Sequence, residues 1–165
     1  MANENMTMSA DGMTLLRLSE GAVLRYYNDL ANNCTYGIGT LVHAGACTQD
    51  ELRLPVTEQQ VNAQLAVRVR TAESAVRRGV PHFQLTQAQF DALVSFVYNV
   101  GAAGAATALA AADRGASPDV VADMNARVYV HPRDAQGRRL PAVRVQGLVN
   151  RRQREAAPFV QAVPR

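Results

Sequence analysis

The chain has 165 residues, 48% of them hydrophobic, so it is long enough for one globular domain with its own core. All 17 basic residues are arginine and the net charge is +3, which favours an anionic partner such as nucleic acid, a membrane surface or a bacterial cell wall. Apolar runs stay short of the roughly 20 residues of a membrane span, and the N-terminus lacks the basic and apolar regions of a signal peptide, so we expect neither a transmembrane segment nor an encoded export signal.

The N-terminal part predicts a short helix followed by a small antiparallel sheet. Apolar residues at helical spacing over 12–20 follow Ser9 and Asp11, which both suit an N-cap, and precede Gly21, a helix stop. The aromatic and β-branched runs at 23–28 and 36–43 predict strands, and the residues DLANNCT between them are rich in turn formers.

Helices are predicted for most of the chain after residue 56. Thr-x-x-Gln capping boxes at Thr57 and Thr86 open a long helix that ends at Gly79 and a second helix, FDALVSFVYNVG, with a buried apolar stripe. The Ala-rich segment 101–113 is also good helix material.

The C-terminal third predicts two more helices around a loop. Ser117 and Pro118 suit the N-cap and first position of a helix to about residue 128. Residues 130–146 are loop-like, and 150–161 predict an amphipathic helix interrupted by Pro158. The expected fold class is α+β, mainly helical. A sheet lobe (about 21–56), a linking helix and a helical lobe (about 80–165 plus the N-terminal helix) form one domain with a cleft between the lobes.

Two acids in the N-terminal part are candidates for catalysis. Glu20 ends the first predicted helix, and Asp29 lies in the turn after the first strand, an arrangement that can place their carboxyl groups on opposite walls of a cleft. A protonated and an ionised carboxyl group facing each other are the minimum for acid-catalysed glycoside hydrolysis. Thr35 offers a hydroxyl that can hold a water beside Asp29. By spacing alone, two solvated surface acids are the commoner interpretation.

Three motifs, found in one order along the chain, make a catalytic role the preferred interpretation of these two acids. Glu20, eight residues, Asp29, five residues, Thr35 and then Gly37-Ile38-Gly39 resemble the phage-type lysozymes, the endolysins of glycoside hydrolase family 24. FDALVSFVYNVG at 90–101 looks like the central buried helix of that family, and GLVNRRQRE at 147–155 looks like its Arg-rich C-terminal helix. The resemblance covers nearly the whole chain and implies a lysozyme-like fold.

The resemblance also implies roles for individual residues. Glu20 matches the general acid, Asp29 the carboxylate that stabilises the transition state or activates water, and Thr35 the residue that positions this water. Tyr98 and Asn99 match residues that touch the glycan. Arg151 matches an arginine that pairs with the catalytic glutamate and fixes its orientation.

One departure from the family pattern concerns a histidine. The family often has His directly after the Gly-x-Gly, where this chain has Thr40; the nearest imidazole is His43. We expect either that His43 substitutes in the supporting role or that it is a plain loop histidine.

Two cysteines are too few for a disulfide framework, and no His or Cys stands at zinc-finger spacing from them. Related sequences with Asn-Cys-Thr favour a bridge between Cys34 and Cys47 that braces the Thr35 strand, and two buried thiols are the alternative.

The implied function is a muramidase that cleaves the β-1,4 bond of peptidoglycan for host lysis, without metal or organic cofactor. Its partners would be glycan strands and, indirectly, a holin; it would be a monomer made in the host cytoplasm that acts in the periplasm. A lytic transglycosylase and a catalytically silent peptidoglycan-binding module are the alternatives. The arginine clusters lack a nucleic-acid-binding motif, so no nucleic acid is expected.

Overall fold

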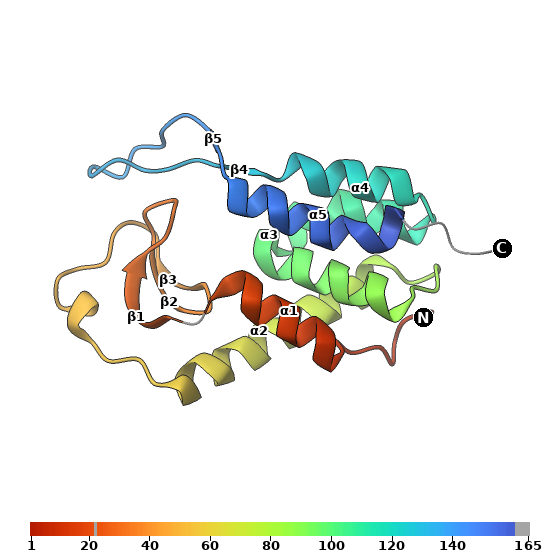
Figure 1. Ribbon diagram of the computed structural model, residues 1–165, viewed down its shortest axis with the longest axis horizontal. Coiled ribbons are helices and arrows are strands. Elements are labelled where there is room, and N and C mark those ends of the chain that lie inside the picture. The colour runs from red at the N-terminus through yellow and green to blue at the C-terminus, as the bar shows by residue number, and fades with distance from the viewer. Residues whose placement is uncertain (22, 161–165) are drawn as a thin grey trace. The chain divides into compact units, whose positions relative to one another are not determined.

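The computed structural model describes residues 1–21 and 23–160, and these fall into two compact units (Figure 1). Unit 1 contains residues 1–16, 68–128 and 146 onward; unit 2 contains residues 17–67 and 129–145. Helices α1 (Ala10–Glu20) and α2 (Glu58–Gly79) each contribute one part to each unit.

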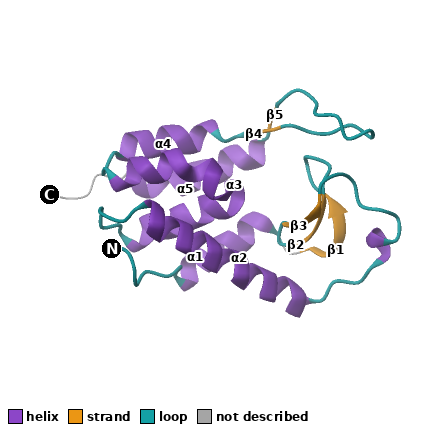
Figure 2. Ribbon diagram, turned by 180° about the vertical axis from the view of Figure 1, so that it is seen from behind, coloured by secondary structure: helices purple, strands orange, loops and turns teal. Residues whose placement is uncertain are grey.

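Unit 1 is built around three helices that pack on one another: α3 (Gln87–Asp113), α4 (Ser117–Ala126) and α5 (Gln146–Val160) (Figures 1 and 2). The predicted apolar stripe of α3 is confirmed, because Phe90, Leu93, Val94 and Val97 are all buried. The capping box at Thr86 is also confirmed: its side chain accepts from the Gln89 N–H, and the Gln89 side chain accepts from the Thr86 N–H. Burial of this stripe explains why α3 is the central helix of the unit.

Helix α3 is interrupted at Gly101, which has a φ of 78° that side-chain-bearing residues rarely adopt. By length and composition, α3 is nevertheless the one helix in the described part of the chain that could cross a membrane. Half of its apolar window is buried inside the protein, so its apolar character is that of a core helix.

Unit 2 contains a three-stranded antiparallel sheet in the order β1 (Val23–Asn28), β2 (Cys34–Gly37) and β3 (Thr40–His43). The predicted single strand over 36–43 is wrong, because it is divided between β2 and β3. Gly37 and Gly39 have φ values of 61° and 67°, so the Gly-Ile-Gly turn reverses the chain. A Cβ on Gly37 would lie 2.7 Å from Val61 Cγ2, so the close packing of this turn against α2 also requires glycine.

The start and end signals of α1 and α2 behave as predicted. The Ser9 Oγ caps α1 by accepting from the Gly12 N–H at 3.0 Å, and Gly21 ends the helix with a φ of 63°. Asp11 lies in the first turn of α1 instead of at its cap. Thr57 and Gln60 form the expected capping box of α2.

Three expectations for the C-terminal third are wrong in detail. Ser117 is the first residue of α4 and not its N-cap, which is Ala116. The loop-like residues 130–146 take part in a short antiparallel pair, β4 (Tyr129–Val130) with β5 (Val143–Arg144), which two-residue strands give no periodicity to reveal. Pro158 lies inside α5 without interrupting it, since a proline near the helix end removes only one hydrogen bond. Gln161, the end of the predicted helix, lies outside the described residues.

Candidate active site

Asp29 opens the turn that joins β1 to β2. Its Oδ1 accepts from the N–H groups of Ala31 at 2.9 Å and Asn33 at 2.8 Å, and Asn32 takes a left-handed conformation with a φ of 58°. Asp and Asn suit such a turn because their side chains bond nearby backbone and tolerate left-handed φ. Oδ1 of Asp29 therefore holds the turn.

Thr35 lies on β2 and is only 3% exposed. Its Oγ1 donates to the Asn33 carbonyl at 3.3 Å, while the Asn33 N–H donates to Asp29. A single residue, Asn33, thus contacts both candidate groups. Asn33 is itself held by its Oδ1, which accepts from the Gly45 N–H at 3.2 Å. The structure therefore links Asp29 in the turn and Thr35 on β2 through Asn33.

Glu20 is the last residue of α1 and is half-buried. It belongs to unit 2, as do Asp29 and Thr35, so one compact unit contains all three predicted catalytic residues. The separation of the two carboxyl groups stays a prediction.

The residues expected to touch glycan lie in unit 1, at the C-terminal end of the first half of α3. Tyr98 is buried, and the Arg68 guanidinium carbon lies 4.1 Å from its ring centre, a cation–π contact. Arg68 also donates to the Tyr98 carbonyl at 3.2 Å. Asn99 is exposed, and its Oδ1 accepts from Arg152. The two neighbouring residues are therefore each held by an arginine.

Arg151 belongs to a buried charge network in unit 1. Its Nε donates to Glu155 Oε1 at 2.8 Å, and its Nη2 donates to the Ser95 carbonyl at 3.1 Å. Ser95 Oγ donates to the same carboxylate at 2.6 Å, and Arg152 donates to its other oxygen. Arg151 and Glu20 belong to different units, and their pairing stays a prediction.

The predicted disulfide between Cys34 and Cys47 is present, with Cα atoms 4.5 Å apart. It joins β2, directly before Thr35, to the loop that follows β3. The alternative of two buried thiols is therefore wrong for this structure. We expect the bridge to brace the Thr35 strand, because it closes a loop around β3.

His43, at the end of β3, forms an ion pair with Glu51 of the short helix η1 (Glu51–Arg53). Its Nε2 lies 2.9 Å from Glu51 Oε1, and its Nδ1 lies 3.0 Å from the Ala44 carbonyl. The Ala44 carbonyl and then the Glu51 carboxylate raise the pKa of His43. The Thr48 N–H and, less strongly, His43 lower the pKa of Glu51. Both ring nitrogens thus contact Ala44 and Glu51, and the supporting role that was one of the two expectations for His43 stays a prediction.

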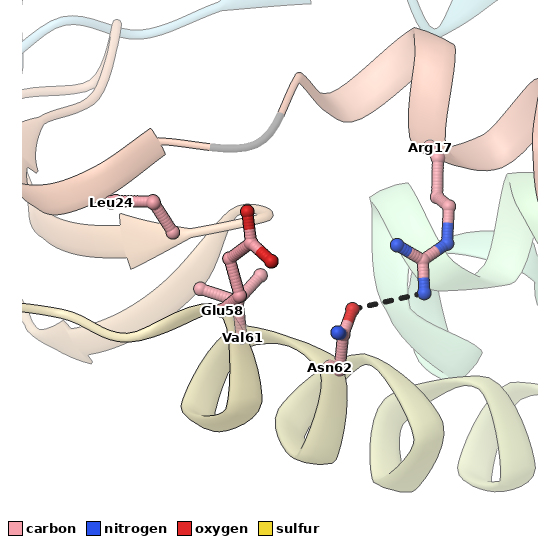
Figure 3. Close-up of a pocket in the computed structure, with 5 residues that line it drawn as sticks. All are labelled: Arg17, Leu24, Glu58, Val61 and Asn62. Carbon is pink, nitrogen blue, oxygen red and sulfur yellow. Dashed lines mark hydrogen bonds between the residues drawn. The ribbon is translucent and has the colours of Figure 1, made fainter.

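A pocket of about 270 Å³ in unit 2 was not predicted from the sequence (Figure 3). It is lined by Arg17 at the end of α1, Leu24 of β1, and Glu58, Val61 and Asn62 of α2. Arg17 Nη2 donates to Asn62 Oδ1 at 3.0 Å. The four-residue spacing of Glu58 and Asn62 places them on one helix face, but the approach of Arg17 and Leu24 depends on the tertiary fold.

Comparisons with known proteins agree with this architecture. The Phage lysozyme family model matches residues 17–155. The endolysin of Bacillus phage PZA is 31% identical over 163 residues, which are 97% of this chain and 57% of that protein. The endolysin of Salmonella phage P22 is 30% identical over 98 residues, 58% of this chain and 64% of that protein.

A solved structure, the endolysin from Escherichia coli O157:H7 phage FAHEc1, superimposes with a TM-score of 0.73 at 28% identity and covers 98% of each chain. The expected lysozyme-like fold is therefore confirmed, and the chain belongs to the phage lysozyme family. Its match extends over 57% and 64% of the length of the two curated relatives.

Proposed function

We propose that this chain is a muramidase that hydrolyses the β-1,4 bond between N-acetylmuramic acid and N-acetylglucosamine in bacterial peptidoglycan. The observation that carries the proposal is the family match over residues 17–155, which contains every residue of the candidate site. The names of its relatives, endolysins of phages, support the same activity. We further propose that the two units form one catalytic domain.

In the proposed reaction, Glu20 protonates the leaving glycosidic oxygen as general acid. Asp29 stays ionised and either stabilises the positive charge that develops on the sugar or directs a water. Thr35 holds that water beside Asp29. The contacts of Asn33 with both residues support these roles, because they fix the directions of the Asp29 carboxylate and the Thr35 hydroxyl.

The remaining site residues would bind and orient. Tyr98 and Asn99 would contact the glycan, and Arg151 would pair with Glu20 and fix the direction of its carboxyl group. The anchoring of these residues by Arg68, Arg152 and Glu155 supports a preorganised surface, which lowers the entropic cost of binding the sugar.

A catalytically silent wall-binding module is the rival from another class. We expect Glu20→Gln to reduce clearing of a purified peptidoglycan suspension by about 100-fold or more, because a general acid contributes that much, while pelleting with peptidoglycan is kept. The matched control is Asp50→Asn, which changes an exposed carboxyl group of the same unit.

Both variants should unfold at the same temperature as the wild type. Glu20→Gln that keeps more than about a tenth of the activity would show that the acid is misassigned. A wild type that binds peptidoglycan without clearing it would establish the silent module.

A lytic transglycosylase is the rival with the same substrate. It would use only the general acid and would release 1,6-anhydro sugars, since a hydroxyl of the sugar itself attacks. Asp29 and Thr35 favour hydrolysis, because a group that places water has no role in the anhydro reaction. Mass spectrometry of the digest distinguishes the two reactions: we expect products that have gained one water per cleaved bond, and anhydro ends would exclude hydrolysis.

In the cell, the proposed role is lysis of a bacterial host at the end of phage infection. The enzyme would act in the periplasm as a monomer and would depend on a holin, a pore-forming partner, to reach the wall. No nucleic acid takes part in this proposal.

A further inference from the structure

We propose that unit 2 binds one Zn²⁺ ion when the Cys34–Cys47 bond is reduced. The ligands would be the two cysteine sulfurs, the His43 imidazole and the Glu51 carboxylate. This site goes beyond the proposed hydrolase activity, and its test does not depend on that activity.

The geometry of three of these groups, Cys34, His43 and Glu51, carries this inference. Ligand atoms of Cys34, His43 and Glu51 all lie within 4.8 Å of one another. The Cys34 Sγ lies 3.9 Å from Glu51 Oε2, and the His43 Nε2 lies 2.9 Å from Glu51 Oε1. Neighbouring ligands of tetrahedral zinc with nitrogen, oxygen and sulfur donors are separated by about 3.3–3.8 Å. The separations among these three groups therefore differ by at most about 1.5 Å from those of zinc ligands.

Cys47 would supply the fourth ligand once the bond to Cys34 is broken and the two sulfurs move apart, because its sulfur starts beside that of Cys34. Reduction adds two electrons and two protons, breaks the sulfur–sulfur bond and leaves two thiols beside the imidazole and the carboxylate. Two sulfur ligands, one nitrogen and one oxygen make a four-coordinate set that suits Zn²⁺.

The groups around the ligands are already arranged for a metal. A carbonyl can only accept, so the Nδ1–H of His43 donates to Ala44, and Nε2 is the nitrogen that faces Glu51. A hydrogen bond of this kind to the outer nitrogen is typical of zinc-bound histidine. The Thr48 N–H similarly orients the Glu51 carboxylate at 2.7 Å.

The His43 Nε2 and the Glu51 carboxylate approach each other beside the Cys34 sulfur, and the ion would bind among these atoms. Zinc binding would displace the two thiol protons, and the neutral imidazole would ligate through Nε2. The ion has a route of entry, because the His43 and Glu51 side chains are 39% and 23% exposed, while the Cys34 sulfur is buried.

A second histidine–carboxylate pair in the protein provides the matched control. In unit 1, His82 Nδ1 lies 2.8 Å from Asp113 Oδ2, but neither cysteine belongs to that unit. If a histidine beside a carboxylate were sufficient for metal binding, the two pairs would behave alike. Because only the His43 pair lies beside cysteine sulfurs, we expect only that pair to bind zinc tightly.

The test uses the full chain, reduced with a phosphine, desalted without oxygen and titrated with Co²⁺ as a spectroscopic substitute for Zn²⁺. We expect one Co²⁺ per chain, with the intense visible bands of tetrahedral cobalt and a sulfur-to-cobalt charge-transfer band, both abolished by one equivalent of Zn²⁺. The disulfide form should show neither band, since its sulfurs cannot ligate as thiolates.

Variants identify the ligands. Cys34→Ser, Cys47→Ser and His43→Gln should each weaken Zn²⁺ binding by more than about 10-fold, measured by competition with a chromophoric chelator, because loss of a ligand costs at least as much as loss of an outer-shell partner. Glu51→Gln should weaken binding similarly, while His82→Gln should bind as the wild type does.

Circular dichroism of each reduced variant confirms that it is folded. Absence of the charge-transfer band in the folded, reduced wild type would overturn the proposal, and so would equal metal binding by the oxidised chain. Because hydrolase activity is not read out, these results are distinct from any failure of the muramidase assignment.

Discussion

The Thr35 hydroxyl can be tested apart from the rest of its side chain. Thr35 is buried and donates to the Asn33 carbonyl, which fixes the direction of the hydroxyl. We expect Thr35→Ala to lower kcat by about 100-fold or more through a misplaced water, while Thr35→Ser keeps most of the activity. Initial rates of peptidoglycan clearing measure both. Equal losses in the two variants would show that packing of the methyl group matters and that the hydroxyl does not.

The ion pair of His43 and Glu51 predicts a pH dependence of stability. Because folding raises the pKa of His43 above 6.5, its contribution is fully present below that value and is lost as the pH rises through the folded pKa. Folding lowers the pKa of Glu51 below 4.5, so its contribution is present above that value and is lost as the pH falls through the folded pKa.

We therefore expect His43→Gln to destabilise the oxidised protein more at about pH 5.5 than at about pH 9. Urea unfolding of both proteins at the two pH values measures the difference. The control is His131→Gln, whose imidazole faces the Leu140 carbonyl and not a carboxylate. If His43→Gln lowered the free energy of unfolding more at high pH than at low pH, the result would contradict the raised pKa of His43.

At the scale of the element, α5 depends on one buried carboxylate. Glu155 accepts from Arg151, Arg152 and Ser95, and both arginines are buried. We expect Glu155→Ala to lower the free energy of unfolding by about 3–5 kcal/mol, since two buried guanidinium groups lose their partner. Urea unfolding measures this loss. The control is Gln153→Ala on the exposed face of α5, and a loss for Glu155→Ala below about 1 kcal/mol would show that water replaces the carboxylate.

Helices were predictable because their signals are local. The capping boxes at Thr57 and Thr86 set the starts of α2 and α3, and apolar spacing set the buried face of α3. The strands were less predictable: 36–43 looked continuous because Tyr36 and Leu41 flank glycines that suit either a strand or a turn. Their positive φ decides for a turn, and this depends on the packing of Gly37 against Val61.

At the scale of the whole molecule, only the disulfide links distant parts of unit 2 covalently. Its cysteines are 13 residues apart, and in the chain-entropy model such a loop contributes about 3 kcal/mol. We expect reduction in the presence of a chelator to lower the free energy of unfolding by about that amount. Added Zn²⁺ should restore part of it, because the ion would bind only the folded site.

Urea unfolding followed by circular dichroism measures the effect, and Cys34→Ser/Cys47→Ser is the control that reduction should leave unchanged. Titration of the unfolded, air-oxidised chain should find close to no free thiols. Two free thiols per chain would show that the bridge does not form in solution.

The sequence alone determined the helices, the mainly helical α+β class and the family, because capping, apolar period and ordered motif spacing are all properties of nearby residues. It also named the residues of the candidate site, through the resemblance. Only the tertiary structure decided which distant side chains meet: that Ser95 of α3 contacts Arg151 and Glu155 of α5, and that His43 faces Glu51 beside Cys34. Cys34, His43, Cys47 and Glu51 match no zinc-finger spacing, so no local pattern reveals them as a set. These residues come together because β2 pairs with β3, which sets Cys34 opposite His43, and because the chain after β3 brings Cys47 and Glu51 to them. Such contacts are fixed by folding and not by spacing along the sequence.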